Sequence, residues 1–203
     1  LRDDVYLSLR GLPGVAQAAN VTYLTMQVRQ GDRDVRSMVV GIAPGQADAP
    51  GRPPYLVAGR HITRSHYEAV ADIATGFRIG DRIRIRRNLY TVVGLTRRMV
   101  SSGGDPMVFI PLKDAQTAQF LKDNDAVWQG RRRTEANPAF NRPGVPGLLE
   151  AVISSQSSNT YVNAVLMRLQ PGQAPEAVAA GIQRWQRLTA YTRPQMEEIL
   201  VGK

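Results

Sequence analysis

The segment that most constrains the fold is GFRIGDRIRIRRNLYTVVGL, at residues 76–95. Its centre alternates between apolar and charged side chains, and this period of two is typical of a half-buried β-strand. The isoleucines are predicted to face a core and the arginines to face outward. YTVVGL is rich in strand-forming residues and is predicted to be the return strand of a hairpin. The alternating residues are Arg82, Ile83, Arg84, Ile85 and Arg86.

The corner before this strand is also predictable. Gly80 permits a positive φ, and the side chain of Asp81 can hydrogen-bond the nearby backbone. We therefore expect one element to end and the next to begin at these two residues.

The N-terminal quarter of the chain predicts a helix followed by a hairpin. Apolar residues recur at helical spacing from Val5, and alternation over residues 15–28 predicts a strand. RQGDR at 29–33 predicts a turn, and a second strand is expected to end at Ile42. The Pro- and Gly-rich stretch at 43–54 predicts a subdomain boundary.

The middle of the chain is predicted to mix helices, strands and a long loop. Ser65 is a candidate N-cap for a helix that runs through Ile73. A strand is expected over Met107–Pro111 and a helix over 113–121. Residues 123–159 lack periodicity and are rich in Pro, Gly, Ser and Asn, so we expect a long irregular loop that is functional or mobile.

The C-terminal part regains regular patterns. We expect a strand over 161–170, a helix beginning near Pro175, a strand over 187–192 and a last helix from Arg193. The order of elements is therefore αββ, then a separate middle part, then βαβ.

This order predicts an α+β fold in two parts. Residues 1–43 and 160–203 are expected to form one small sheet covered by two helices. Residues 44–159 are expected to form an inserted small α/β subdomain, which contains the irregular loop at about 123–159.

Several kinds of active site are excluded by what the sequence lacks. It has no cysteine, no lysine in a phosphate-binding Gly-rich loop and no Gly-x-Ser-x-Gly motif. Its two histidines, His61 and His66, lie near Glu68, but their spacing favours ordinary surface histidines over a metal site. We therefore expect no catalytic, cofactor or metal site, and no enzyme activity.

The positive charge has two interpretations. The formal net charge is +9, and residues 51–100 hold ten arginines against three acidic residues. The face of Arg82, Arg84 and Arg86 could make the chain a basic binding module for nucleic acid or anionic surfaces. It could equally be the solvated side of a strand, and the low aromatic content of 6% favours this second interpretation.

A further candidate surface lies within the irregular loop. Aromatic and arginine side chains dominate binding energy at protein interfaces. A solvated loop is the alternative interpretation. The candidate partner-binding residues are Trp128, Arg131, Arg132, Arg133 and Phe140.

The order of motifs resembles that of a known family. LRGLPGVAQAANV, VVGI and LVAGRHIT precede the hairpin, and VFIPL follows it. Within this order lie Gly59-Arg60, IGDRI at 79–83 and YTVVGL at 90–95. Together these motifs resemble the extracytoplasmic, periplasmic core domain of MacB-type, FtsX-like ABC transporter permeases. The resemblance covers nearly the whole chain, and the segment at 123–159 departs from better-known members.

The resemblance implies a fold and a location. Both chain ends would form a porter-like subdomain, with a small α/β subdomain inserted between them. The ends would connect to transmembrane helices of an integral membrane protein. The chain itself would be a soluble domain at the periplasmic face of the inner membrane.

The resemblance also implies a function without chemistry in this domain. Cytoplasmic ATP hydrolysis would be coupled to substrate export or to mechanotransmission across the envelope. A separate nucleotide-binding domain or subunit would bind the ATP, and no cofactor is expected in this domain. The implied partners are a second permease copy, an ABC ATPase and a periplasmic adaptor, and no nucleic acid is expected.

Overall fold

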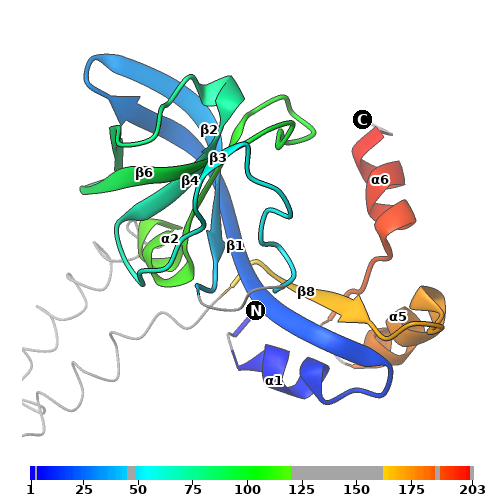
Figure 1. The fold of residues 1–203 in the computed structure, drawn as a ribbon. Coiled ribbons are helices and arrows are strands. Elements are labelled where there is room, and N and C mark those ends of the chain that lie inside the picture. Colours follow the sequence, from blue (N-terminus) through cyan, green and yellow to red (C-terminus); the bar gives the residue numbers. More distant parts are fainter. Residues whose placement is uncertain (3, 45–48, 120–161, 186–187, 202–203) are drawn as a thin grey trace, which may run out of the picture.

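Eight strands in the described part of the chain belong to one mixed sheet (Figure 1). Together with the helices they confirm a mixed α+β fold. The computed structural model describes residues 1–2, 4–44, 49–119, 162–185 and 188–201.

Six of these strands close into a barrel. Each strand hydrogen-bonds to its neighbours, and β1 pairs with both β2 and β5, which closes the ring. Closure leaves these strands few free edges for pairing with other chains. In order around the ring, the strands are β1 (Val15–Gln30), β2 (Arg33–Ile42), β7 (Met107–Pro111), β4 (Glu68–Asp72), β6 (Asn88–Thr96) and β5 (Arg82–Ile85). A short strand, β3 (Ala58–Gly59), pairs with β6.

Successive side chains of a strand point to opposite faces, so every second side chain of each barrel strand points inward. These inward side chains form the main core. Ile83 and Ile85 of β5 point inward and are at most 1% exposed, as the sequence predicts. Helix α2 (Leu112–Gln119) contributes Ala115 to this core. The helix packs so closely on β2 that a Cβ atom at Gly41 would collide with the Cβ of Ala115.

A second core lies on part of the outer face of the barrel. Val40, Val70 and Phe109 point outward from β2, β4 and β7, and they pack with Ile62 from the segment that precedes β4. That segment therefore covers one side of the barrel. The outward side of β5 is left open.

Strand β1 extends beyond the barrel. Its residues from Val21 to Gln30 pair with β2, whereas those from Val15 to Val21 pair with β8 (Ala164–Leu169). Val21 therefore marks the junction between the barrel and a second layer. One continuous strand belongs to both.

Figure 1 shows α1 (Val5–Arg10) and α5 (Pro175–Gln183) at the β8 end of β1, and α6 (Arg193–Val201) leading away from α5 toward the C-terminus. The first residue is tied to the start of the C-terminal part, because Leu1 and Val162 exchange hydrogen bonds of 3.0 and 2.6 Å between backbone N and O atoms.

Several predicted elements are confirmed. The N-terminal helix, the β1–β2 and β5–β6 hairpins, β7, α2, β8, α5 and α6 all lie where the periodicity predicts them, within a few residues. The turn between β1 and β2 uses Gly31 with a φ of +59°.

The predicted helix from Ser65 through Ile73 is wrong. This stretch contains β4, followed by a single 3₁₀ turn over Ile73–Thr75. β4 is buried on both faces between β6 and β7, with Ala69 facing the barrel interior and Val70 facing the outer core. A strand buried on both faces has no alternation, so its pattern cannot be distinguished from that of a short buried helix.

Two smaller predictions are also wrong. Residues 188–192 form no strand. Their polar groups are instead bonded by helix side chains: Gln183 Nε2 donates to the Ala190 carbonyl, and the Thr192 backbone N–H donates to Gln195 Oε1. Arg86 lies in the turn after β5 with a φ of +56°, and not on the strand face.

The predicted irregular loop at 123–159 lies outside the described residues. None of the helices within the described ranges combines the length and apolar character needed to cross a membrane.

Candidate functional site

The corner before β5 has the predicted geometry. Gly80 adopts a φ of +89°. Asp81 Oδ2 accepts a hydrogen bond of 2.8 Å from the backbone N–H of Arg78, and the Asp81 N–H donates to the Arg78 carbonyl. These bonds fix where β5 begins and therefore which of its residues face outward.

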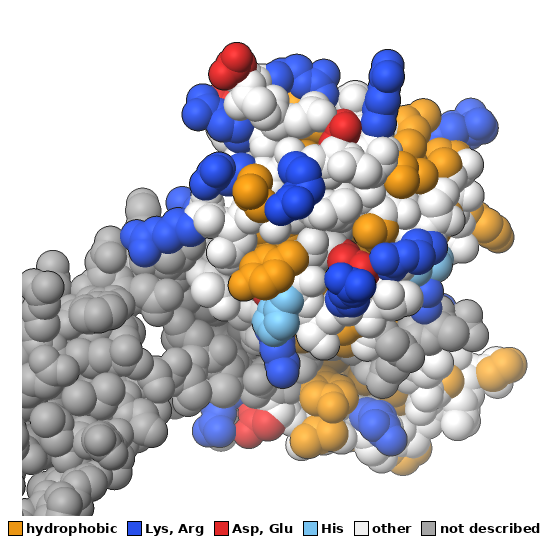
Figure 2. Space-filling view, turned by 60° about the vertical axis from the view of Figure 1, so that its left-hand side comes forward, with side chains coloured by type: hydrophobic (Ala, Val, Ile, Leu, Met, Phe, Trp, Pro, Cys, Tyr) orange, Lys and Arg blue, Asp and Glu red, His pale blue; other side chains and the backbone are white. Residues whose placement is uncertain are grey.

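The outward face of β5 carries two exposed arginines, Arg82 and Arg84. Thr91 of β6 lies directly opposite Arg82, and Leu89 lies opposite Arg84. On its other side β5 meets β1, where Arg29 lies opposite Arg84. Figure 2 shows several Lys and Arg side chains spread over this side of the molecule, with other surface between them.

One hollow of about 540 Å³ lies between β1 and β5. Arg29, Arg82, Arg84 and Leu89 line it, together with Gly31. Arg29 is already paired, since its Nε and Nη2 atoms donate to the carboxylate of Asp34 at 3.0 and 3.3 Å. This bond raises the pKa of Arg29 above its ordinary value.

A second hollow of about 300 Å³ adjoins the first, and the two share Arg82 and Leu89. Arg60 and Glu68 also line it. The buried Glu68 carboxylate accepts two hydrogen bonds from Arg60, of 2.6 and 3.1 Å, and one each from the backbone N–H groups of Thr63 and Arg64. These donors lower the pKa of Glu68 to about 2.

The two histidines lie in different surroundings. His66 Nδ1 lies 2.6 Å from Asp114 Oδ1, and Asp114 Oδ2 accepts a hydrogen bond from the Tyr67 N–H. The pKa of His61 is lowered by burial and by the charge of Arg52. Across the described ranges, no three His, Cys, Asp or Glu side chains are grouped closely enough to hold a metal ion.

An apolar groove of about 560 Å³ lies at the other end of the molecule, between β8, α5 and α6. Val165, Met167, Ile182, Tyr191 and Met196 are among the residues that line it. It is separate from the arginine face, which belongs to the barrel.

The arginines of this face, Arg82 and Arg84, are suited to binding an anion. The buried carboxylates beside it, those of Glu68 and Asp114, are both engaged by internal hydrogen bonds. A guanidinium group stays protonated in proteins, so it donates hydrogen bonds but cannot act as a base. The face can therefore hold an anion.

The structure brings together only part of what the sequence suggested. Arg82 and Arg84 lie side by side, whereas Arg86 lies in the adjoining turn. Sequence patterns did not indicate Arg29 or Arg60 as members of this face, because their placement depends on pairing between distant strands. The loop candidates lie outside the described residues; they are Trp128, Arg131, Arg132, Arg133 and Phe140.

Comparisons with known proteins agree with the fold. The structure is similar to the crystal structure of the periplasmic region of MacB from Actinobacillus actinomycetemcomitans, with a TM-score of 0.54 and 10% identity over 91% of this chain and 73% of that one. The extracellular domain of the noncanonic ABC-type transporter YknZ from Gram-positive bacteria is 17% identical, with a TM-score of 0.47 over 58% of this chain. The chain covers 65% of that domain, and at this score the likeness supports no conclusion.

No curated protein matches the chain. The comparison of the sequence with family models, in contrast, identifies a family. A family model described as the MacB-like periplasmic core domain matches residues 1–185, which is most of the chain. The chain therefore belongs to the MacB-like periplasmic core domains, the periplasmic or extracellular domains of ABC transporter permeases.

Proposed function

We propose that this domain transmits mechanical work in its permease and carries out no chemistry of its own. ATP hydrolysis by a separate cytoplasmic ABC ATPase moves the permease, and the domain converts that motion into substrate export or into force across the envelope. The working unit contains a second permease copy. A periplasmic adaptor receives the motion, and the loop carrying Trp128, Arg131, Arg132, Arg133 and Phe140 contacts it.

The observation that carries this proposal is the continuity of β1. The strand is hydrogen-bonded to β8 on one side of Val21 and to β2 of the barrel on the other. A displacement of the β8 end therefore reaches the barrel through a covalent, hydrogen-bonded strand and not through a flexible linker. Hydrogen-bonded strands resist such bending better than the Pro- and Gly-rich connections that join independent domains.

In this proposal the chain is divided into two subdomains. Residues 1–43 and 160–203 form the porter-like part, and residues 44–159 form the insert. The pairing of β1 with β8 supports the first part, since it joins both ends of the chain. Strands β1 and β2 link this part to the insert by pairing with β5 and β7.

An insertion at the junction tests the coupling. Two glycines placed after Val21 in the full permease keep the alternation of faces but interrupt the strand between its two partners. We expect the variant to fail to complement the phenotype of a permease deletion, while the purified transporter retains its basal ATPase activity.

The matched control places two glycines after Gly104, in the turn between β6 and β7, where a side chain would meet no atom within 4 Å. This variant should complement fully, and limited proteolysis should show both variants to be folded. Full complementation by a folded junction variant would contradict the proposed coupling.

A further inference from the structure

Two rows of residues cross the open face of the barrel. The first row runs from Asp34 on β2 to Arg29 on β1, Arg84 on β5 and Leu89 on β6, each opposite the next. The second row runs from Arg82 on β5 to Thr91 on β6 and Glu68 on β4. Each row has a carboxylate at one end, Asp34 in the first and Glu68 in the second, and Arg82 and Arg84 lie between these two carboxylates.

The two carboxylates form ion pairs with neighbouring arginines other than Arg82 and Arg84. Asp34 holds Arg29, and Glu68 holds Arg60, with Arg64 at 3.8 Å. Arg82 and Arg84, in the centre, form no ion pair with any residue that the structure describes.

Positive charge is concentrated at the centre of this face. Arg29 and Arg84 lie directly opposite each other on neighbouring strands, and like charges in that position destabilise a sheet. Arg82 lies on the same face of β5, two residues before Arg84 and roughly 6.6 Å from it along the strand. An anion in this position would relieve the repulsion and accept hydrogen bonds from all three guanidinium groups.

We propose that Arg82 and Arg84, assisted by Arg29, bind a phosphate-bearing ligand in the groove formed by the two adjoining hollows. The ligand is a free phosphate compound or a phosphorylated lipid headgroup, which present the same group to the arginines. The shared lining residues, Arg82 and Leu89, lie where the hollows meet, so the phosphate binds at the centre.

The chemistry of the donors favours phosphate over carboxylate. A guanidinium group presents a planar fork of N–H donors that matches two oxygens of a phosphate. A carboxylate has two oxygens in one plane and suits a single fork, whereas the oxygens of a phosphate point in several directions and can meet forks from two strands. A phosphate monoester also carries up to two negative charges near neutral pH, which suits the two unpaired arginines.

The surroundings also argue against a nucleic acid strand as the ligand. Proteins that bind single strands stack successive bases on exposed aromatic rings. Among the described residues that line the groove, Tyr67 provides the only aromatic ring besides the imidazole of His66.

Calorimetry and vesicle sedimentation with the 203-residue chain test this proposal. The soluble probe is inorganic pyrophosphate. The membrane probes are phosphatidylcholine vesicles with and without phosphatidic acid. Binding to pyrophosphate or to the phosphatidic acid vesicles is expected, and it should weaken as salt is added because it depends on charge.

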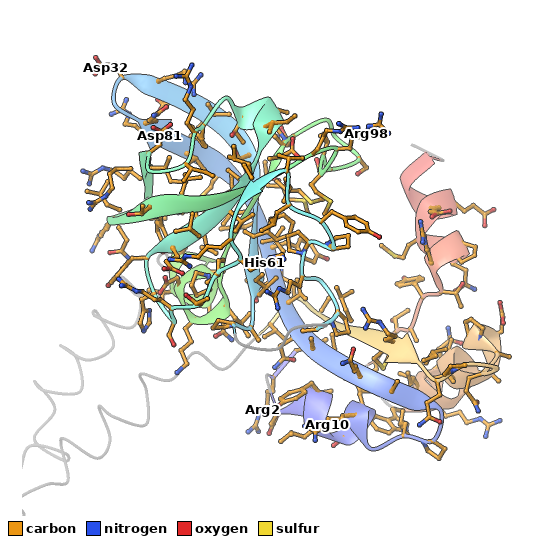
Figure 3. The ribbon with its side chains drawn as sticks, viewed as in Figure 1. Arg2, Arg10, Asp32, His61, Asp81 and Arg98 are labelled. Carbon is orange, nitrogen blue, oxygen red and sulfur yellow. The ribbon has the colours of Figure 1, made fainter. Side chains whose placement is uncertain are left out.

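The decisive variant is Arg82→Gln with Arg84→Gln, which should weaken this binding at least about tenfold. The matched control is Arg97→Gln with Arg98→Gln, which removes the same charge from exposed arginines; Figure 3 shows Arg98 on the side of the barrel away from Asp32 and Asp81. The control should bind as the unaltered chain does. Arg82→Lys with Arg84→Lys keeps the charge but loses the fork, so binding should again weaken.

Binding of either probe through Arg82 and Arg84 supports the proposal, and the probe that binds identifies the source of the phosphate. Equal losses in the groove and control variants would overturn it, because they would show a diffuse effect of net charge. An absence of binding to both probes would overturn it as well.

Discussion

At the scale of single residues, Glu68 is the buried charge with the most extensive set of donors among the described residues. It is 5% exposed and lies at the start of β4, where its carboxylate joins the segment of Arg60 to Arg64 to the barrel. Glu68 and Arg60 also line the second of the two hollows that form the proposed phosphate-binding groove. Glu68 therefore links the stability of the segment that precedes β4 to the shape of the groove.

Glu68→Gln is expected to lower the free energy of unfolding by about 2 kcal/mol, since hydrogen bonds to a charged group are lost and the new amide N–H₂ meets other donors. Chemical denaturation at neutral pH measures this change. Glu197→Gln, in an exposed pair with Arg193, is the matched control and should change stability by less than about 0.5 kcal/mol. An equal effect of both substitutions would contradict the role of Glu68.

The same carboxyl predicts a pH dependence. Its pKa is lowered from the ordinary 4.5 to about 2 in the folded state. Its contribution is therefore complete above pH 4.5, shrinks as the pH falls below that value and is lost once the pH passes below 2. Over this window the unaltered chain should lose more stability than Glu68→Gln does. Parallel pH profiles of the two proteins would contradict the assignment.

At the scale of elements, the β5–β6 hairpin divides its residues between stability and binding. Ile83 and Ile85 fill the barrel, and the Gly80-Asp81 corner fixes the register that keeps them inward. Arg82 and Arg84 are left on the open face. One strand of four residues therefore serves the core on one side and a binding surface on the other.

Ile83→Ala should destabilise the chain by about 3 kcal/mol, because it leaves a cavity in the closed barrel. Arg84→Ala should change stability by no more than about 0.5 kcal/mol, since the side chain is exposed and its charge faces Arg29. Thermal or urea unfolding followed by circular dichroism distinguishes the two. A large loss with Arg84→Ala would mean that the arginine serves the fold and not a ligand.

At the scale of the whole molecule, the barrel is built from distant parts of the chain. β1 and β2 come from the N-terminal part, whereas β4 to β7 come from the proposed insert. The ring closes only when both are present. Although the subdomain boundary proposed at residue 44 separates the two parts in sequence, they share hydrogen bonds and a core.

A fragment of residues 15–119 contains all six strands of the ring and should unfold cooperatively on heating. A fragment of residues 44–119 lacks β1 and β2, which leaves two open edges and exposes the interior apolar residues. We expect the shorter fragment to show no cooperative transition by circular dichroism. Cooperative unfolding of that fragment would show that the insert folds independently.

Local patterns in the sequence predicted the elements whose two faces differ. The alternation of Ile83 and Ile85 with arginine, the Gly80-Asp81 corner and the helical spacing in α5 each depend on neighbouring residues. The order of these motifs also indicated the family, which the match over residues 1–185 confirms. These features could be predicted because short-range steric effects and the burial of one face act in the same way wherever the element lies in the fold.

Only the tertiary structure decided the rest. β4 is a strand because it lies between β6 and β7, and the stretch at 188–192 is no strand because helix side chains bond its polar groups. The pairing that places Arg29 opposite Arg84 joins residues 55 positions apart. No local propensity encodes such a register, because it results from closing the barrel around a shared core. The sequence by itself therefore determined that Arg82 and Arg84 face outward, and the closed barrel determined that Arg84 meets Arg29.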